Sequence, residues 1–235
     1  MNRRLAVLVI AATLGPGTLA RGQSDYILEP SPSLASAGVP RPLAELLTPE
    51  GSRLVRTAGG AHAPICDVWW VKSVPTVKPA GSSPDILENN IQAGTLMGLL
   101  QFLSPDAEDF RDQKLKPGLY TMRYAQIPQD GNHMGVSQYR DFLLLSPVGA
   151  DAQVGMALSF DDLLNLSRRA SGTSHPAVMS LAAANPAYKK LPAVVADDQG
   201  NCSIQALLHE TSAAGVQEMA VALVLITPAK EGGGS

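Results

Sequence analysis

Short apolar runs alternate with polar turn residues along most of this chain. Runs rich in Val, Leu and aromatic residues recur, and Gly, Pro and Asp separate them. This spacing is typical of an all-β sandwich and not of alternating helices and strands. We therefore expect about eight strands, at residues 53–57, 65–74, 95–103, 118–126, 141–148, 177–181, 202–209 and 216–227.

The clearest alternation lies in residues 118–126, where polar side chains separate three large apolar ones, Tyr120, Met122 and Tyr124. Successive side chains of a strand point to opposite faces. The pattern predicts that these three side chains face the core, whereas Thr121 and Arg123 face water.

One segment has helical spacing instead. Acidic residues follow Ser159, a residue type that caps a first turn, and basic residues precede Gly172, a residue type that closes a last turn. We expect one short helix at residues 159–170, which covers one end of the sandwich.

Residues 1–20 have the pattern of a secretory signal peptide. Arg3 and Arg4 precede an apolar run, and the segment ends in small residues. Glycine and proline interrupt the run well short of the roughly 20 residues that a membrane-spanning helix needs. We expect cleavage near Ala20 and a secreted or periplasmic protein with no membrane span.

The remaining chain divides into three parts by composition. Residues 21–50 contain a stretch rich in Pro, Ser and Ala and predict a flexible tether. Residues 51–228 hold all the strand patterns and predict a single β-sandwich domain. Residues 229–235 end in Gly and Ser and predict a disordered tail.

The mature chain would be mildly acidic. Loss of Arg3 and Arg4 lowers the basic count from 18 to 16 against 21 acidic side chains, a formal charge of −5. There is no Lys/Arg cluster, and neutralisation of phosphates supplies most of the affinity for nucleic acid. We expect no nucleic-acid partner, but an unknown protein or small-molecule ligand.

Two cysteines would remain after cleavage. Cys66 shares a predicted strand face with Val68, and Cys202 alternates with Ile204, so both could face one core. An oxidising compartment would permit a disulfide between Cys66 and Cys202. The alternative is two separate buried thiols that behave as small apolar residues. Sequence gives no distance, so both alternatives stay open.

Residues 127–139 predict a long loop between two strands. Long ordered loops in compact domains are more often functional than accidental. The loop contains Asp130, His133 and Met134, and Asp141 follows it. We expect these four residues to contact the ligand, unless they serve only as turn and core-edge residues.

The same loop offers a metal-binding alternative. The Met134 thioether beside the His133 imidazole suits copper(I), whereas imidazole with nearby carboxylates suits zinc or copper(II). His175, which follows the predicted helix, is the best further ligand. A copper or zinc site at His133, Met134 and His175 is therefore the second hypothesis.

Two acids accompany strongly apolar runs. Asp67 lies inside one, and Asp141 precedes another. Each could have a perturbed pKa, but an ion pair or a loop-capping role is the more ordinary expectation, with Arg123 or Arg140 as partner. Trp69 and Trp70 are adjacent in one predicted strand and must face opposite ways, so we expect a second layer or the helix to cover the outer one.

The chain lacks the G-x-S-x-G elbow, the phosphate-binding G-x-x-x-x-G-K-[ST] loop and the C-x-x-C pair. Ser171, Ser174 and His175 are close in sequence, but the members of a triad meet in space with an oriented base. These absences lower the expectation of an enzyme.

Four motifs resemble a group of secreted bacterial proteins of unknown function: KPGLYTMRY from Lys116, PQDGNHMG from Pro128, DFLLLSP from Asp141 and SGTSHP from Ser171. The resemblance covers roughly residues 65 to 182, and it implies no activity or ligand. The KPGLYT turn is also similar to transthyretin-like and carboxypeptidase-regulatory β-sandwiches. That resemblance implies an accessory or binding module.

Together these patterns predict a secreted, non-catalytic binding or interaction module of unknown ligand. The alternative is a periplasmic copper- or zinc-binding protein that uses the loop at residues 127–139. A weaker third hypothesis is a hydrolase that uses Asp130 or Asp141. It requires one of these acids within hydrogen-bond reach of His133 or His175.

Overall fold

A computed structural model of the chain describes residues 25–79, 81–128 and 137–228. Strands dominate these residues and join in one large sheet, which is antiparallel except at one short edge strand. The all-β prediction is confirmed.

The elements occur in the order β1 (Tyr26–Pro30), α1 (Arg41–Ala44), β2 (Ser52–Arg56), η1 (Ala58–Gly60), β3 (Ala63–Trp70), β4 (Val74–Pro75), β5 (Leu96–Phe102), β6 (Gly118–Gln126), β7 (Asp141–Pro147), α2 (Phe160–Ser171), β8 (Val178–Ala182), β9 (Ala193–Ala196), β10 (Cys202–Ser212) and β11 (Gly215–Ile226). The eight predicted strand segments coincide with β2, β3, β5, β6, β7, β8, β10 and β11. The sequence patterns did not predict β1, β4 or β9.

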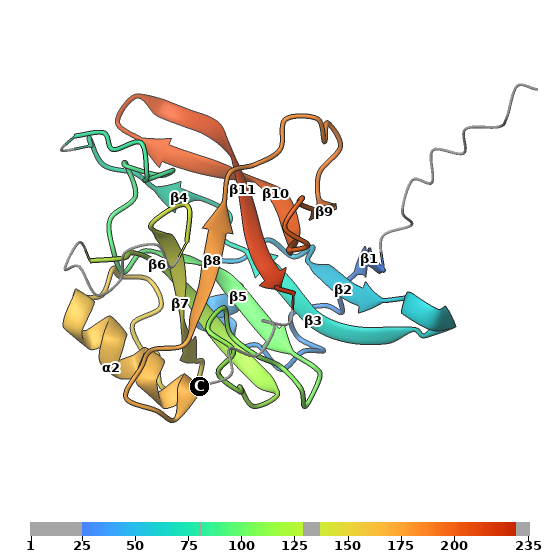
Figure 1. Cartoon of the computed structure of the whole chain (residues 1–235). Coiled ribbons are helices and arrows are strands. Elements are labelled where there is room, and N and C mark those ends of the chain that lie inside the picture. The colour runs from blue at the N-terminus through green and yellow to red at the C-terminus, as the bar shows by residue number, and fades with distance from the viewer. Residues whose placement is uncertain (1–24, 80, 129–136, 229–235) are drawn as a thin grey trace, which may run out of the picture.

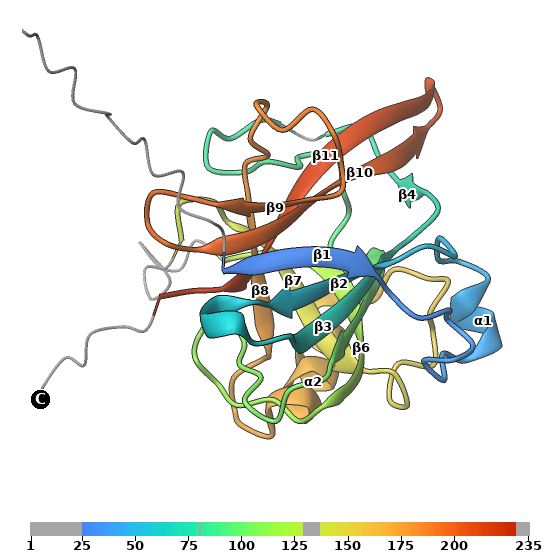
Figure 2. The same cartoon turned by 90° about the vertical axis from the view of Figure 1, so that its right-hand side faces the viewer.

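The sheet folds over at β8 and forms two layers (Figures 1 and 2). Its strand order is β1-β2-β3-β5-β6-β7-β8-β11-β10-β4, and β9 pairs with β10. One part of β8 pairs with β7, and the next part pairs with β11. The first layer contains β1 to β7 apart from β4, and the second contains β9, β10, β11 and β4. Figure 2 shows β9 of the second layer beside β1 of the first.

The main core fills the space between the two layers. It includes Met122 and Leu143 from the first layer and Ile204 and Leu223 from the second, all fully buried. Tyr120, Met122 and Tyr124 belong to this core, as the alternation predicted. Burial of each large apolar side chain contributes about 1.5–3 kcal/mol, so this core dominates the stability of the domain.

The predicted polar face of β6 is wrong. Thr121 and Arg123 are both fully buried, because the segment at residues 149–158 folds over the outer face of the strand. The predicted covering helix is present as α2. Ser159 caps it, Gly172 ends it in the left-handed conformation, and its apolar side packs over β7 in a second, smaller core.

The predicted flexible tether is also wrong beyond residue 25. Strand β1 pairs with β2, and apolar side chains of the following segment are buried in the main core, namely Leu34, Val39, Leu43 and Leu47. The prolines occupy positions that tolerate them: Pro30 ends an edge strand, and Pro42 lies in the first turn of α1. This segment helps to cover β3, so Trp69 and Trp70 are both buried, as expected.

Cys66 and Cys202 lie in the same core as free thiols. Of the two alternatives, the structure therefore has separate buried thiols. Burial raises the pKa of Cys66 far above its usual value and raises the pKa of Cys202 to about 11, so both thiols stay protonated at neutral pH.

The predicted signal peptide and C-terminal tail lie outside the described residues. Within the part of the chain that the structure describes, no helix is long and apolar enough to span a membrane.

Candidate functional site

The loop between β6 and β7 was the first candidate for a binding site. Asp130, His133 and Met134 lie outside the described residues, so their roles stay predictions. The base of the loop is described. The Ile127 amide donates to the Arg140 carbonyl at 2.8 Å, and the Arg140 guanidinium donates to the Ile127 carbonyl at 2.6 and 2.9 Å. Arg140 therefore ties the two ends of the loop together instead of pairing with Asp67 or Asp141.

Asp141 is fully buried at the start of β7, and its carboxylate holds the connection between β4 and β5. It accepts hydrogen bonds from the backbone amides of Leu87 and Glu88 at 2.8 and 3.0 Å and from the Tyr124 hydroxyl at 2.7 Å. Burial raises the pKa of Tyr124, which keeps its proton for this bond. Asp141 thus has a loop-capping role, and these three donors occupy its oxygens.

Glu88 is the most perturbed carboxyl group in this region. Burial, the Asp141 charge and the Glu210 charge together raise its pKa to about 7. Glu210 belongs to β10 and accepts a hydrogen bond from the Asn90 side chain at 2.8 Å. The connection between β4 and β5 is therefore fastened to both layers through acidic side chains.

His175 lies at the other end of β7 from Asp141. The Ala177 carbonyl accepts a hydrogen bond from the Leu145 amide, which fixes His175 near the C-terminal end of β7. At about 3.3 Å per strand residue, Asp141 and His175 are roughly 15–20 Å apart. The structure does not bring them together, so Asp141 and His175 do not form the acid–histidine pair that the hydrolase hypothesis requires.

The serines near His175 form no triad with its ring. The Ser171 hydroxyl donates to the His175 backbone carbonyl at 2.6 Å, and the Thr173 hydroxyl lies 3.2 Å from the Ser171 hydroxyl. These bonds close the turn after α2. Within residues 25–79, 81–128 and 137–228, no group of three His, Cys, Asp or Glu side chains is arranged to hold a metal ion. The copper or zinc hypothesis depends on His133 and Met134 and stays a prediction.

Asp67 has a partner that the sequence analysis did not name. It is fully buried on β3 and forms a two-bond ion pair with Arg53 of β2, at 2.7 and 2.8 Å. The two residues face each other across the antiparallel pair. The Arg53 guanidinium therefore balances the Asp67 charge within the sheet.

Arg123 and Asp151 form a second ion pair that is completely buried. The Arg123 Nε and Nη2 atoms donate to the two Asp151 carboxylate oxygens at 2.7 and 2.9 Å, and Thr121 donates to the same carboxylate at 2.7 Å. Burial would raise the pKa of Asp151, but the hydrogen bonds from Arg123 and Thr121 outweigh it and lower that pKa.

The rest of the Arg123 guanidinium holds the covering segment. It donates to the backbone carbonyls of Gly94, Gln153 and Met156 at 2.7, 2.8 and 2.7 Å. All five guanidinium N–H groups thus have acceptors. This network, in which the Arg123 and Asp151 side chains are fully buried, fixes residues 149–158 in place.

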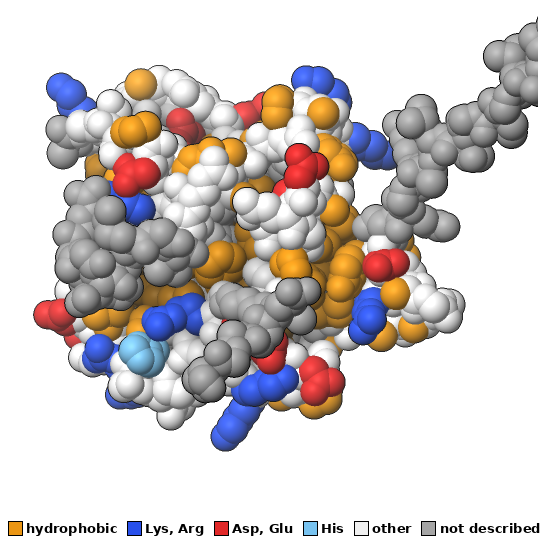
Figure 3. All heavy atoms as spheres, in the orientation of Figure 1, with side chains coloured by type: hydrophobic (Ala, Val, Ile, Leu, Met, Phe, Trp, Pro, Cys, Tyr) orange, Lys and Arg blue, Asp and Glu red, His pale blue; other side chains and the backbone are white. Residues whose placement is uncertain are grey.

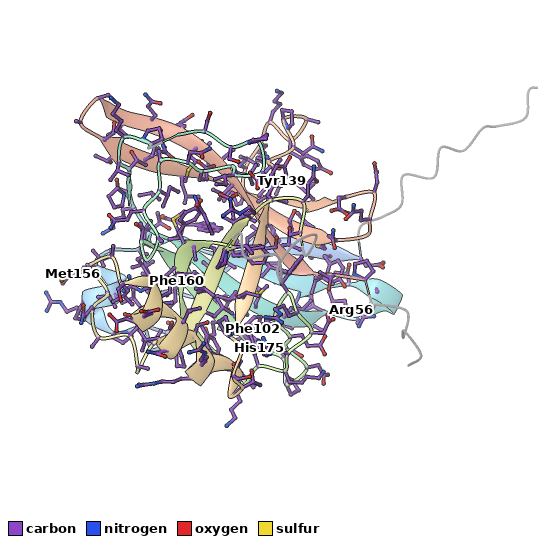
Figure 4. The ribbon with its side chains drawn as sticks, turned by 60° about the vertical axis from the view of Figure 1, so that its left-hand side comes forward. Arg56, Phe102, Tyr139, Met156, Phe160 and His175 are labelled. Carbon is purple, nitrogen blue, oxygen red and sulfur yellow. The ribbon has the colours of Figure 1, made fainter. Side chains whose placement is uncertain are left out.

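One hollow, which we call the Met156 groove, lies beside that segment. It has a volume of about 300 Å³, and its walls include Leu46, Val77 and Met156. Met156 and Val77 are exposed. Figure 4 shows Met156 on the opposite side of the molecule from Arg56.

A larger hollow, which we call the inter-layer groove, opens where the second layer separates from the first. It has a volume of about 360 Å³. Both layers supply apolar walls, with Ile65, Phe102 and Met179 on one side and Val224 to Ile226 of β11 on the other. Figure 3 shows hydrophobic side chains gathered in the hollow between the end of β11 and strands β1 and β2.

The polar groups of the inter-layer groove include Arg56 on one strand and acidic residues of the connection after β5. Arg56 is exposed at the end of β2, directly opposite Tyr26 of β1. On the far side, Glu108 pairs with Lys114 at 2.9 Å. The groove therefore combines apolar and charged side chains in its walls, and a small-molecule site needs both kinds of group.

Sequence reasoning did not identify the inter-layer groove. Its residues come from β1, β2, β3, β5, β8, β11 and the connection after β5, and each is ordinary for a strand or turn. Arg56 ends a predicted strand, but nothing nearby in the sequence indicates that β11 and Phe102 lie beside it.

Comparison with known proteins adds no relative: no protein-family model, curated protein or solved structure matches this chain. The resemblance to secreted bacterial proteins and to transthyretin-like sandwiches therefore stays a prediction.

Proposed function

We propose that this chain is an exported, non-catalytic binding module whose inter-layer groove holds a small apolar ligand. One observation carries the proposal: the cavity of about 360 Å³ between the layers has apolar walls from both of them. Sites for small molecules usually have volumes of about 300–1,000 Å³ and mostly apolar walls. The proposal that the protein is exported comes from the pattern of residues 1–20.

The apolar walls favour an apolar ligand for a simple energetic reason. Removal of apolar surface from water contributes about 25 cal/mol per Å². Phe110, Ile65 and Ile226 line the groove and are only partly buried. A ligand that covers these side chains removes both its own surface and theirs from water.

The polar side chains of the groove favour binding over catalysis. Asp109 accepts hydrogen bonds from the amides of Arg111, Gln113 and Val178 at 2.9, 2.9 and 3.1 Å. The Ser104 hydroxyl accepts from the Asp106 amide at 3.1 Å. These groups stabilise the connection after β5, so neither is positioned with a base or nucleophile partner.

The proposal is tested with N-phenyl-1-naphthylamine, a neutral apolar dye that becomes fluorescent in an apolar site. Ala63 lies at the groove and is exposed, so Ala63→Trp should fill the groove without disturbing the core. Ala213 is exposed in the turn between β10 and β11, at the other end of β11. Ala213→Trp is therefore the matched control.

We expect saturable binding of one dye per chain in the unmodified protein and in Ala213→Trp, and a loss of at least tenfold in affinity in Ala63→Trp. Absence of saturable binding, or equal binding by both variants, would contradict the proposal. The far-UV circular dichroism of both variants should match that of the unmodified protein.

A further inference from the structure

Arg56 places a positive charge at the mouth of the inter-layer groove. It is exposed, and its guanidinium makes no hydrogen bond or ion pair with any other described residue. Several other arginines are engaged: Arg53 with Asp67, Arg123 with Asp151, and Arg140 with a carbonyl. Arg56 is therefore available to a ligand.

The position of Arg56 is fixed by the sheet. It is the last residue of β2, and it faces Tyr26 on one neighbouring strand and Ala63 on the other. Its charge acts on the Tyr26 phenol, which also lines the groove. The pairing with two strands fixes the Arg56 backbone, so only the side chain has to be ordered when a ligand binds.

The acidic groups of the groove do not cancel this charge. Glu108 is paired with Lys114, and Asp106 also acts on Lys114. Four N–H groups saturate the Asp109 carboxylate, including the Gln113 side chain at 2.7 Å. Asp25, next to Tyr26 in the sequence, makes no ion pair with Arg56 among the described contacts.

We propose that the ligand is a single-chain carboxylic acid, whose carboxylate pairs with Arg56 at the mouth while its alkyl chain lies along Ile65, Phe110 and Ile226. This inference rests on the proposed function. The guanidinium fork matches a carboxylate with two parallel hydrogen bonds. A cavity of about 360 Å³ lies at the lower end of the range for small-molecule sites, and this size favours one chain over a two-chain lipid.

The test is displacement of N-phenyl-1-naphthylamine by three ligands that share a ten-carbon chain: decanoate, decanol and decylammonium. A charge-assisted hydrogen bond contributes about 1.5–3 kcal/mol, which corresponds to at least tenfold in affinity. We expect decanoate to compete about tenfold better than decanol in the unmodified protein, and decylammonium to compete worst.

Three variants separate the role of Arg56 from a general effect of charge. Arg56→Gln should make decanoate and decanol equal while dye binding persists. Arg56→Lys keeps the charge without the fork and should retain part of the preference. Arg169 is exposed on α2, outside the groove, so Arg169→Gln makes the same change in net charge and should retain the full preference.

The outcomes distinguish the two levels of the argument. If the dye binds but decanoate and decanol compete equally in the unmodified protein, the carboxylate inference is wrong and the binding function stands. Better competition by decylammonium would also overturn the inference. If the dye does not bind, or a dimer that Ala63→Trp dissociates occupies the groove, both proposals fail.

Discussion

The buried Arg123–Asp151 pair allows a quantitative prediction. Arg123→Met removes the guanidinium from a site where both side chains are fully buried. Asp151 then keeps only the Thr121 hydroxyl and the backbone as donors, and three backbone carbonyls lose theirs. Breaking a buried ion pair from one side costs about 3–5 kcal/mol. The buried Gly94 carbonyl adds about 1 kcal/mol, whereas the Gln153 and Met156 carbonyls are only partly buried and can accept from water instead. We expect a loss of about 4–6 kcal/mol in unfolding free energy.

The partner change, Asp151→Asn, should also be costly, because it leaves a buried guanidinium without its counter-charge. The double variant, Arg123→Met with Asp151→Asn, removes both charges and should cost less than the sum of the single changes. Residues in one hydrogen-bonded network show interaction energies of about 0.5–3 kcal/mol. We expect a coupling near the upper end of this range.

The assay is urea unfolding with linear extrapolation. Trp69 and Trp70 are both buried, so their emission reports the transition directly. The reasoning is refuted if Arg123→Met costs less than about 1 kcal/mol, or if the two single changes add within about 0.5 kcal/mol. Because the pKa of Asp151 is lowered in the folded protein, the stabilisation should be present above the unfolded pKa of 3.8 and disappear as the pH falls through the folded value.

Three further predictions concern other parts of the chain. Folding raises the pKa of Glu88 from 4.5 to about 7, so the Glu88 charge destabilises the fold increasingly as the pH rises from 4.5 through 7. Glu88→Gln should therefore raise the unfolding free energy at pH 8 by about 1–2 kcal/mol, a value reduced because the side chain is partly exposed to solvent. At pH 4 the same change should give no gain. Gly94 has a φ of +86°, and a Cβ at this position would meet the Leu158 backbone. Gly94→Ala should therefore lower the thermal midpoint of unfolding by several degrees. Gly149 is exposed and has open space around it, so the control Gly149→Ala should leave the midpoint unchanged. Elemental analysis of untagged protein should show stoichiometric copper or zinc that His133→Ala abolishes if the metal-binding alternative is correct, and a metal-free protein would contradict it.

The strands could be predicted from the sequence because burial on one face leaves a period-two pattern. Tyr120, Met122 and Tyr124 show this pattern and do face the core. The same pattern misplaced Arg123, because a polar side chain between apolar ones indicates water only if nothing covers it. Its acceptors come from residues about 30 positions away in either direction, and periodicity carries no information about them.

The N-terminal segment shows that amino-acid composition is also an incomplete guide to whether a segment is ordered. Its many prolines and small residues predicted a tether, but four apolar side chains at residues 34–47 are buried in the main core. They are too sparse to form a run, so they give no strand or helix signal.

The inter-layer groove could not be predicted for a different reason. A local motif lies within one segment of sequence, as the capping residues Ser159 and Gly172 do at the two ends of α2. The groove exists only because β8 changes partners from β7 to β11, which brings Met179 and Val224 to the same hollow. The strand order that produces this arrangement is a long-range property of the chain.

The two buried thiols, Cys66 and Cys202, are natural probes for opening of the core. Cys66 belongs to β3 of the first layer and Cys202 to β10 of the second, and both thiols lie in the core between these layers. A thiol reagent can modify either sulfur only after its surroundings open. The rate at which the two react would therefore report how often the layers separate, without any label having been engineered into the chain.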